Sequence, residues 1–253
     1  MIIRYCSDLH IDFPKNYKYF KKNPIEPGDI LILAGDVIEF NEIREGWYTW
    51  IFDYFSKNFK HVIWIAGNHE YYNGEVGVFQ TKSIITSKYN NIHLIYDDCF
   101  EYENINFICS TLWADIPEHH QFVIKNKMND YVAIKYGDEV LKPHHTTYFH
   151  KQHLDFIFSN IKDDKINIVV THHSPTFMQT NPLYKADITQ YAYHTELHDK
   201  IYDSNIKYWI HGHTHYNHGG IEINNCKILC NQLGYVGDNH LKISYDAFKN
   251  IEL

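Results

Sequence analysis

The 253-residue sequence predicts an α/β fold, and three observations support this prediction. Short runs of β-branched and aromatic residues recur along the chain, and several are apolar throughout, as in strands that a sheet buries on both faces. Amphipathic helical patterns lie between some of these runs, and strands that alternate with helices are typical of α/β folds. Finally, 44% hydrophobic residues and a modest formal net charge of −8 exclude a disordered chain and allow a sizeable core.

The predicted strands are short and rich in residues that favour a pleated, buried surface. In chain order they are residues 2–6, 29–34, 61–66, 92–96, 106–110, 166–171, 207–211, 227–231 and 241–245. Two helices are predicted, over residues 42–58 and 145–162, because apolar residues recur there at three- and four-residue spacing. Residues 114–143 are more polar and less periodic. We therefore expect a single domain over residues 1–253 with a cap-like insertion at that segment.

Composition excludes several classes of function. No apolar run approaches the roughly 18 to 20 residues that a membrane span needs, so no membrane association is expected. A pI near 6.1 disfavours an extended nucleic-acid surface, because neutralising phosphates needs a basic face. The five cysteines are odd in number and lie mostly in apolar runs, which indicates reduced thiols rather than a disulfide framework. The first residues show no secretory leader, so a cytoplasmic protein is expected.

Polar clusters follow five of the predicted strands. Because the carboxyl ends of parallel strands meet at one edge of a sheet, these clusters should lie close together. Asp8 and His10 are two residues apart and point the same way in extended backbone, as do His213 and His215. Carboxylate, imidazole and amide donors together suit divalent manganese, iron or zinc. The clusters are Ser7-Asp8-Leu9-His10, Gly35-Asp36, Gly67-Asn68-His69-Glu70, Thr171-His172-His173-Ser174-Pro175 and His211-Gly212-His213-Thr214-His215.

In their order, these clusters resemble the five motifs of the calcineurin-like metallophosphoesterase superfamily. The resemblance runs from Asp8 to His215, which is most of the chain. It implies a four-layer α/β/β/α sandwich with two packed mixed sheets and a two-metal centre at the carboxyl ends of the strands. Asp36 would bridge the two ions. By this resemblance one ion would be held by Asp8, His10, Asp36 and His215, and the other by Asp36, Asn68, His172 and His213.

A two-metal centre of this kind implies a reaction. Two cations about 3.5–4 Å apart lower the pKa of a shared water and neutralise phosphoryl oxygens during in-line displacement. A bridging hydroxide on the Asp36 side would attack phosphorus, and His69 would protonate the leaving group as general acid. No serine or cysteine nucleophile is needed. The expected activity is hydrolysis of a small phosphomonoester or phosphodiester with two divalent metals, manganese first and iron, zinc, nickel or cobalt as alternatives.

Two assignments within the site stay open. His172 and His173 are adjacent and project in opposite directions, so only one can readily be a primary ligand, and His172 matches the family position. Glu39 follows the second motif, where some family members carry an acidic residue that orients the catalytic histidine. A solvent-exposed glutamate at a helix start fits Glu39 equally well. His211 and His218 flank the last motif and could orient ligands as hydrogen-bond donors.

Three other functions fit the sequence less well than a phosphoesterase. Protein Ser/Thr phosphatases carry an arginine soon after the second motif, and residues 35–40 contain none, so that activity is not expected. A non-catalytic interaction module on the same fold would typically lack a ligand or the acid histidine. A histidine-rich metal-binding protein would explain the 19 histidines but not their ordered aspartate and asparagine partners. The natural substrate and the oligomeric state are left open.

Overall fold

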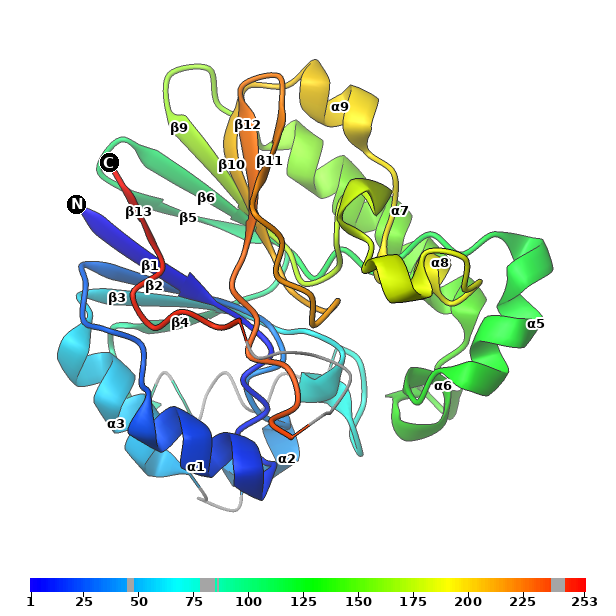
Figure 1. Ribbon diagram of the computed structural model, residues 1–253, viewed down its shortest axis with the longest axis horizontal. Helices are drawn as coiled ribbons and strands as arrows, with labels where there is room; N and C mark the ends of the chain where they lie inside the picture. The colour runs from blue at the N-terminus through cyan, green and yellow to red at the C-terminus, as the bar shows by residue number, and fades with distance from the viewer. Residues whose placement is uncertain (45–47, 78–84, 86, 238–243) are drawn as a thin grey trace.

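Two large mixed β-sheets pack face to face, with helices on both outer sides (Figure 1). The computed structural model describes residues 1–44, 48–77, 85, 87–237 and 244–253. The predicted α/β class and the four-layer α/β/β/α arrangement are both confirmed. The cluster-bearing ends of the strands face the same side of the molecule, and the candidate site lies there.

The first sheet has the strand order β13-β1-β2-β3-β4. Strands β1 to β4 run parallel to one another. Strand β13 lies at the edge of the sheet and pairs antiparallel with β1. Helices α1, α2 and α3 cover the outer face of this sheet. The strands are β1 (Ile2–Cys6), β2 (Ile30–Ala34), β3 (His61–Ile65), β4 (Ile92–Ile95) and β13 (Asn250–Glu252), and the helices are α1 (Pro14–Lys22), α2 (Phe40–Arg44) and α3 (Thr49–Asn58).

The second sheet has the order β11-β12-β10-β9-β6-β5. Its four inner strands are parallel, and the edge strands β5 and β11 are antiparallel to their neighbours. Helices α7 and α9 cover its outer face. The elements are β5 (Asp98–Tyr102), β6 (Ile105–Cys109), β9 (Ile166–Val170), β10 (Ile206–His211), β11 (Ile221–Ile223), β12 (Cys226–Cys230), α7 (Pro143–Ser159) and α9 (His198–Tyr202).

Strict alternation along the strands explains the layering. In β2, Ile30, Ile32 and Ala34 belong to the core between the sheets. Leu31 and Leu33 lie on the other face and pack against the helices. All five residues are fully buried. Because neither face of this strand meets solvent, its sequence is one continuous apolar run.

The remaining elements lie beyond the carboxyl ends of the strands, near the site. Residues 114–143 form α5, α6 and the β7–β8 hairpin, and in Figure 1 α5 and α6 extend from the sheets beside α8. That this segment is a cap-like insertion in a single domain stays a prediction. These elements are α5 (Glu118–Lys127), α6 (Asp130–Ala133), β7 (Lys135–Tyr136), β8 (Glu139–Val140), α8 (Gln190–Tyr193), and the 3₁₀ turns η1 (His69–Tyr71), η2 (Phe177–Gln179) and η3 (Pro182–Tyr184).

The structure corrects some of the predicted elements. The helix predicted over residues 42–58 is divided into α2 and α3, and Tyr48, just before α3, has a left-handed backbone with φ of 64°. Residues 45–47 lie outside the described part, as do 241–243 of the predicted strand 241–245. Ser244 and Tyr245 are not in a strand.

Two further findings concern the cysteine thiols and the possibility of a membrane-spanning helix. All five cysteines are free, in agreement with the absence of a disulfide framework. Among the helices of the described residues, none is both long and apolar enough to cross a membrane.

Candidate metal centre

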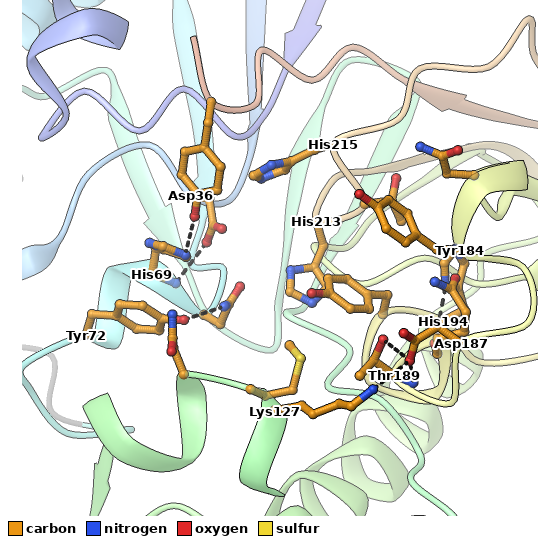
Figure 2. Close-up of a pocket in the computed structure, with 18 residues that line it drawn as sticks. Asp36, His69, Tyr72, Lys127, Tyr184, Asp187, Thr189, His194, His213 and His215 are labelled. Carbon is orange, nitrogen blue, oxygen red and sulfur yellow. Dashed lines mark hydrogen bonds and ion pairs between the residues drawn. The ribbon is translucent and has the colours of Figure 1, made fainter. Parts of the chain in front are cut away.

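The five predicted clusters meet at the carboxyl ends of β1, β2, β3, β9 and β10. They open into a cavity of about 410 Å³, and Figure 2 shows Asp36, His69, His213 and His215 around one side of it. The predicted ligands are brought together although they come from both sheets and are separated by up to 207 residues in sequence (8 to 215). Apart from His215, which is partly exposed, all of them are buried.

The first group of donors is Asp8, His10, Asp36 and His215, whose ligand atoms lie within 4.8 Å of one another. The Nε2 atoms of His10 and His215 are 3.1 Å apart. His215 Nε2 is 3.2 Å from Asp8 Oδ1, and His10 Nε2 is 3.8 Å from Asp36 Oδ2. Two imidazole nitrogens and two carboxylates therefore converge on one point.

The second group is Asp36, His172 and His213, again within 4.8 Å. His172 Nε2 lies 3.3 Å from Asp36 Oδ1 and 3.1 Å from Asn68 Oδ1. Asp36 therefore belongs to both groups, one carboxylate oxygen facing each. This is the position that a bridging ligand would occupy.

The donor set fits a pair of divalent cations. His172 Nδ1 lies 2.8 Å from the Ala34 carbonyl and can donate its proton there, so Nε2 is the atom that faces Asp36 and Asn68. Burial opposes protonation of His172, but the Asp36 carboxylate outweighs it and raises the pKa to about 10, so a metal ion would take the place of the Nε2 proton. His213 Nε2 is buried and has no hydrogen-bond partner among the described residues. Burial, reinforced by neighbouring histidines, lowers the pKa values of His10 and His213 well below the usual range, which favours the neutral, metal-binding form.

Backbone strain concentrates at the same residues. Asp8, His10, Asp36, His213 and His215 all have positive φ, between 44° and 71°. For residues other than glycine this conformation costs roughly 1 kcal/mol or more each, and such strain is typical of functional sites. The turns aim these side chains back into the site after each strand ends.

Two glycines allow the donors to approach so closely. A Cβ atom at Gly67 would overlap Asp36 Oδ1, and one at Gly212 would lie 2.6 Å from Asp8 Oδ2. Both glycines belong to the sequence motifs, and their role is to leave room for a ligand side chain from another strand.

Glu70 ties the loops after β2 and β3 together. Its Oε2 accepts hydrogen bonds from the backbone N–H groups of Asp36 (2.7 Å) and Gly67 (2.8 Å). Its Oε1 accepts from Val37 N (2.7 Å) and Trp64 Nε1 (3.2 Å). Burial, followed by the nearby Asp36 carboxylate, raises the pKa of Glu70 to about 8, while the donors from Val37 and Gly67 oppose that shift. The motif contained this residue, but its role was not predicted.

Asp130, on α6, was missed by the sequence reasoning. Its Oδ1 accepts hydrogen bonds from Asn68 Nδ2 and from the Tyr72 hydroxyl, both at 2.8 Å. The first bond orients the Asn68 amide so that Oδ1 faces His172. Asp130 lies 62 residues from Asn68 in a segment of weak periodicity, so no sequence pattern indicates the contact.

His69 lies beside the two groups rather than in them. Its Nε2 is 3.1 Å from the Tyr235 hydroxyl, and its ring stacks on Tyr72 with centroids 4.0 Å apart. Its backbone N–H donates to Asp36 Oδ1 at 2.9 Å. The carboxylate of Glu39 accepts a hydrogen bond from Asn73 instead, at 3.0 Å, so its proposed action on His69 stays a prediction.

The other open histidines are placed as follows. His173 is buried with its ring 4.2 Å from that of His213, and its Nδ1 is 3.4 Å from the Thr111 carbonyl, whereas His172 is the one that reaches Asp36. His211 contacts Gln179 and the Gly212 carbonyl. His211 and His218 form a third group with Cys230, but His218 Nδ1 accepts from Gly220 N–H, which places the proton on Nε2.

Comparison with known proteins agrees with this geometry. Residues 1–217 match the family model described as calcineurin-like phosphoesterase. The uncharacterized protein L509 of Acanthamoeba polyphaga mimivirus is 30% identical over 282 aligned positions, covering all of this chain and 96% of that protein. The solved structure of the phosphopantetheinyl hydrolase PptH from Mycobacterium tuberculosis has a similar fold, with a TM-score of 0.68 and 16% identity over 92% of this chain and 89% of that one.

Proposed function

Because the chain belongs to the calcineurin-like phosphoesterase family and is thus a hydrolase of phosphoric esters, we propose that it cleaves a small phosphomonoester or phosphodiester at the cluster around Asp36. The observation that carries the proposal is the pair of donor groups that share Asp36, with His69 directly beside them. The family uses two-metal centres. When bound, two divalent cations would supply an activated water and neutralise the phosphoryl oxygens.

In this proposal the chain's own residues hold and orient the reaction. Asp36 offers one oxygen to each donor group and so fixes their separation. Asp8, His10 and His215 complete the first group, and Asn68, His172 and His213 complete the second. Manganese is the metal we propose, because mixed carboxylate, imidazole and amide donors are the set that it accepts.

His69 is proposed as the proton donor to the departing oxygen. Its side chain lines the cavity, so the leaving group of a bound ester can reach it. Its Nδ1 is buried without a hydrogen-bond partner among the described residues, and in that part of the chain its Nε2 has the Tyr235 hydroxyl as its hydrogen-bond partner. A substrate oxygen could replace that hydroxyl at Nε2 and receive the proton there.

The size and position of the cavity support a small substrate. The cavity volume of about 410 Å³ is within the range of small-molecule sites. The walls include residues of α5, of the loop before α6 and of the segment 181–194. The negative net charge again argues against an extended nucleic-acid surface. Five free cysteines support a reducing compartment, and we propose the cytoplasm.

The proposal is tested by stripping the protein of metal and adding back manganese, iron or zinc, with 4-nitrophenyl phosphate and bis(4-nitrophenyl) phosphate as substrates. We expect hydrolysis of at least one ester that depends on added metal and falls at least 100-fold in Asp36→Asn. The matched control is Asp138→Asn, an exposed aspartate in the β7–β8 turn, which should keep full activity. Metal binding without hydrolysis of either ester would favour the non-catalytic module or the metal-binding protein instead.

A further inference from the structure

Across the cavity from the candidate metal centre lies a polar corner formed by Lys127, Asp187 and Thr189. Figure 2 shows these three side chains on the opposite side from Asp36 and His69. Lys127 is the last residue of α5, and Asp187 and Thr189 lie between η3 and α8. None of the three has a role in the hydrolysis proposed above.

Lys127 is the one lysine or arginine among the described residues that line the cavity. Its Nζ lies 3.5 Å from Asp187 Oδ1, longer than a charge-assisted hydrogen bond, and the two side chains are 50% and 37% exposed. An ion pair this exposed contributes at most about 1 kcal/mol. A substrate anion could therefore take up the free N–H groups of Lys127 at little cost.

Asp187 does not depend on Lys127 for its position. Its Oδ1 accepts hydrogen bonds from the backbone N–H and the hydroxyl of Thr189, each at 2.9 Å. This carboxylate is thus fixed by its own loop, and it keeps its position when Lys127 turns from it to a ligand in the cavity.

Aromatic side chains line the cavity, and Tyr72 and Tyr235 do so at the end of the metal centre, where they contact His69. Tyr72, Tyr184, Tyr193 and Tyr235 all contribute to the wall. The Tyr193 ring already stacks on His213, with centroids 4.7 Å apart and an angle of 30° between the planes. Flat rings pack well on such faces. A ligand that carries a flat ring and two separate anionic groups would match the aromatic wall, the Asp36 cluster and Lys127.

We propose that Lys127 binds a second anionic group of the substrate, so that the preferred substrates carry a ring and a phosphate distant from the one that is cleaved. This inference rests on the proposed function, because the cleaved phosphate is placed at the Asp36 cluster. Nucleoside bisphosphates have this chemistry. Lys127 then acts as a specificity-determining residue: it strengthens binding of the substrate without touching the reacting atoms.

The test compares adenosine 3′,5′-bisphosphate with adenosine 5′-monophosphate as competitive inhibitors of 4-nitrophenyl phosphate hydrolysis by the manganese-loaded protein. Competitive inhibition measures the binding of each nucleotide whether or not the protein hydrolyses it. We expect the bisphosphate to bind about five- to tenfold more tightly, the gain of one hydrogen bond to a charged group at a half-exposed site. In Lys127→Met this preference should disappear, while kcat/KM for 4-nitrophenyl phosphate stays unchanged.

Lys125→Met is the matched control, because Lys125 is also in the last turn of α5 but does not line the cavity. It should keep the preference for the bisphosphate. Equal binding of the two nucleotides by the unmodified protein, or the same preference in Lys127→Met, would overturn the inference. If neither 4-nitrophenyl phosphate nor bis(4-nitrophenyl) phosphate is hydrolysed, the proposed function fails, and calorimetric titration of the two nucleotides still ranks their binding to the three proteins.

Discussion

At the scale of single residues, His69 differs from the candidate ligands around it because its Nε2 faces a tyrosine hydroxyl rather than a carboxylate. The ring is held on three sides, by stacking on Tyr72, by an edge contact to His10 with centroids 4.5 Å apart, and by the Tyr235 hydroxyl. In the proposed function, this placement would let His69 give a proton to a ligand in the cavity while the two donor groups would hold the metals.

His69→Ala should therefore separate proton donation from metal binding. We expect both metals to be retained and turnover of an ester with a poor leaving group, such as phenyl phosphate, to fall about 10²- to 10⁴-fold. Turnover of 4-nitrophenyl phosphate should fall much less, because nitrophenolate departs without a proton. The measurement is kcat for the two esters beside metal content by mass spectrometry. Unchanged turnover of both would remove His69 from this role.

Asp130 is expected to act through Asn68. Asp130→Ala leaves the Asn68 amide and the Tyr72 hydroxyl without their acceptor in a buried place, so manganese should bind roughly 10- to 100-fold more weakly, as with other outer partners of metal ligands. Asp130→Asn keeps an oxygen at that position and should restore most of the affinity. Calorimetric titration with manganese measures both, and Asp138→Ala is the control. Equal loss in the alanine and asparagine variants would contradict this role.

Residues of the site differ in how well the sequence alone predicts their roles. Asp8, Asp36 and His213 could be predicted because their residue types and their place after apolar strands are visible locally. Asp130 could not, since its contact depends on how α6 folds back onto the loop after β3. Tyr235, in the loop after β12, also lines the cavity.

At the scale of elements, the loops after β2 and β3 form one unit because a single carboxylate receives donors from both. Glu70→Gln should loosen that unit. Whichever way the amide is oriented, its NH₂ group faces two N–H donors, so about two hydrogen bonds are lost in the interior. We expect the free energy of unfolding to fall by about 2–4 kcal/mol in urea titration at pH 9, above the pKa of about 8, where Glu70 is a carboxylate that can accept all four donors. Glu222→Gln, on the exposed face of β11, should change it by less than about 0.5 kcal/mol.

The sequence predicts helices and strands more accurately where their residues are buried. Strands such as β2 and β3 are apolar throughout and were predicted to within a residue or two. The edge strand β5 has no fully buried residue and carries the exposed charges Asp98 and Glu101, and the sequence pattern does not predict it. The same holds for α1, whose buried residues are only Asn16 and Phe20. Short or half-exposed elements take their structure from neighbours distant in sequence, and the local pattern is then weak.

At the scale of the whole molecule, the fold buries several histidines whose pKa values burial lowers, and this makes stability depend on pH. His194 is an example on the cavity wall. Burial lowers the pKa of His194 to about 4, and its ring stacks on Phe177 with centroids 5.4 Å apart. In the unfolded chain the same side chain has a pKa near 6.5. The stability gained from the neutral form is present above pH 6.5 and is lost as the pH falls toward 4.

His194→Phe should remove this dependence while keeping a ring against Phe177. Between pH 7 and pH 5 the free energy of unfolding of the unmodified protein should fall by about 2 kcal/mol more than that of the variant. Urea titrations at the two pH values measure the difference. The same pH dependence in both proteins would show that His194 does not contribute. His198, an exposed histidine on α9, offers the control His198→Phe.

The central claim for the whole molecule is that strands of both sheets bring their ligands to one centre that holds two metals bridged by Asp36. Anomalous scattering from crystals of the manganese-loaded protein tests it most directly. We predict two peaks about 3.5–4 Å apart, one between Asp8, His10, Asp36 and His215 and the other between Asp36, Asn68, His172 and His213. A single peak there, or manganese bound only elsewhere in the molecule, would contradict it.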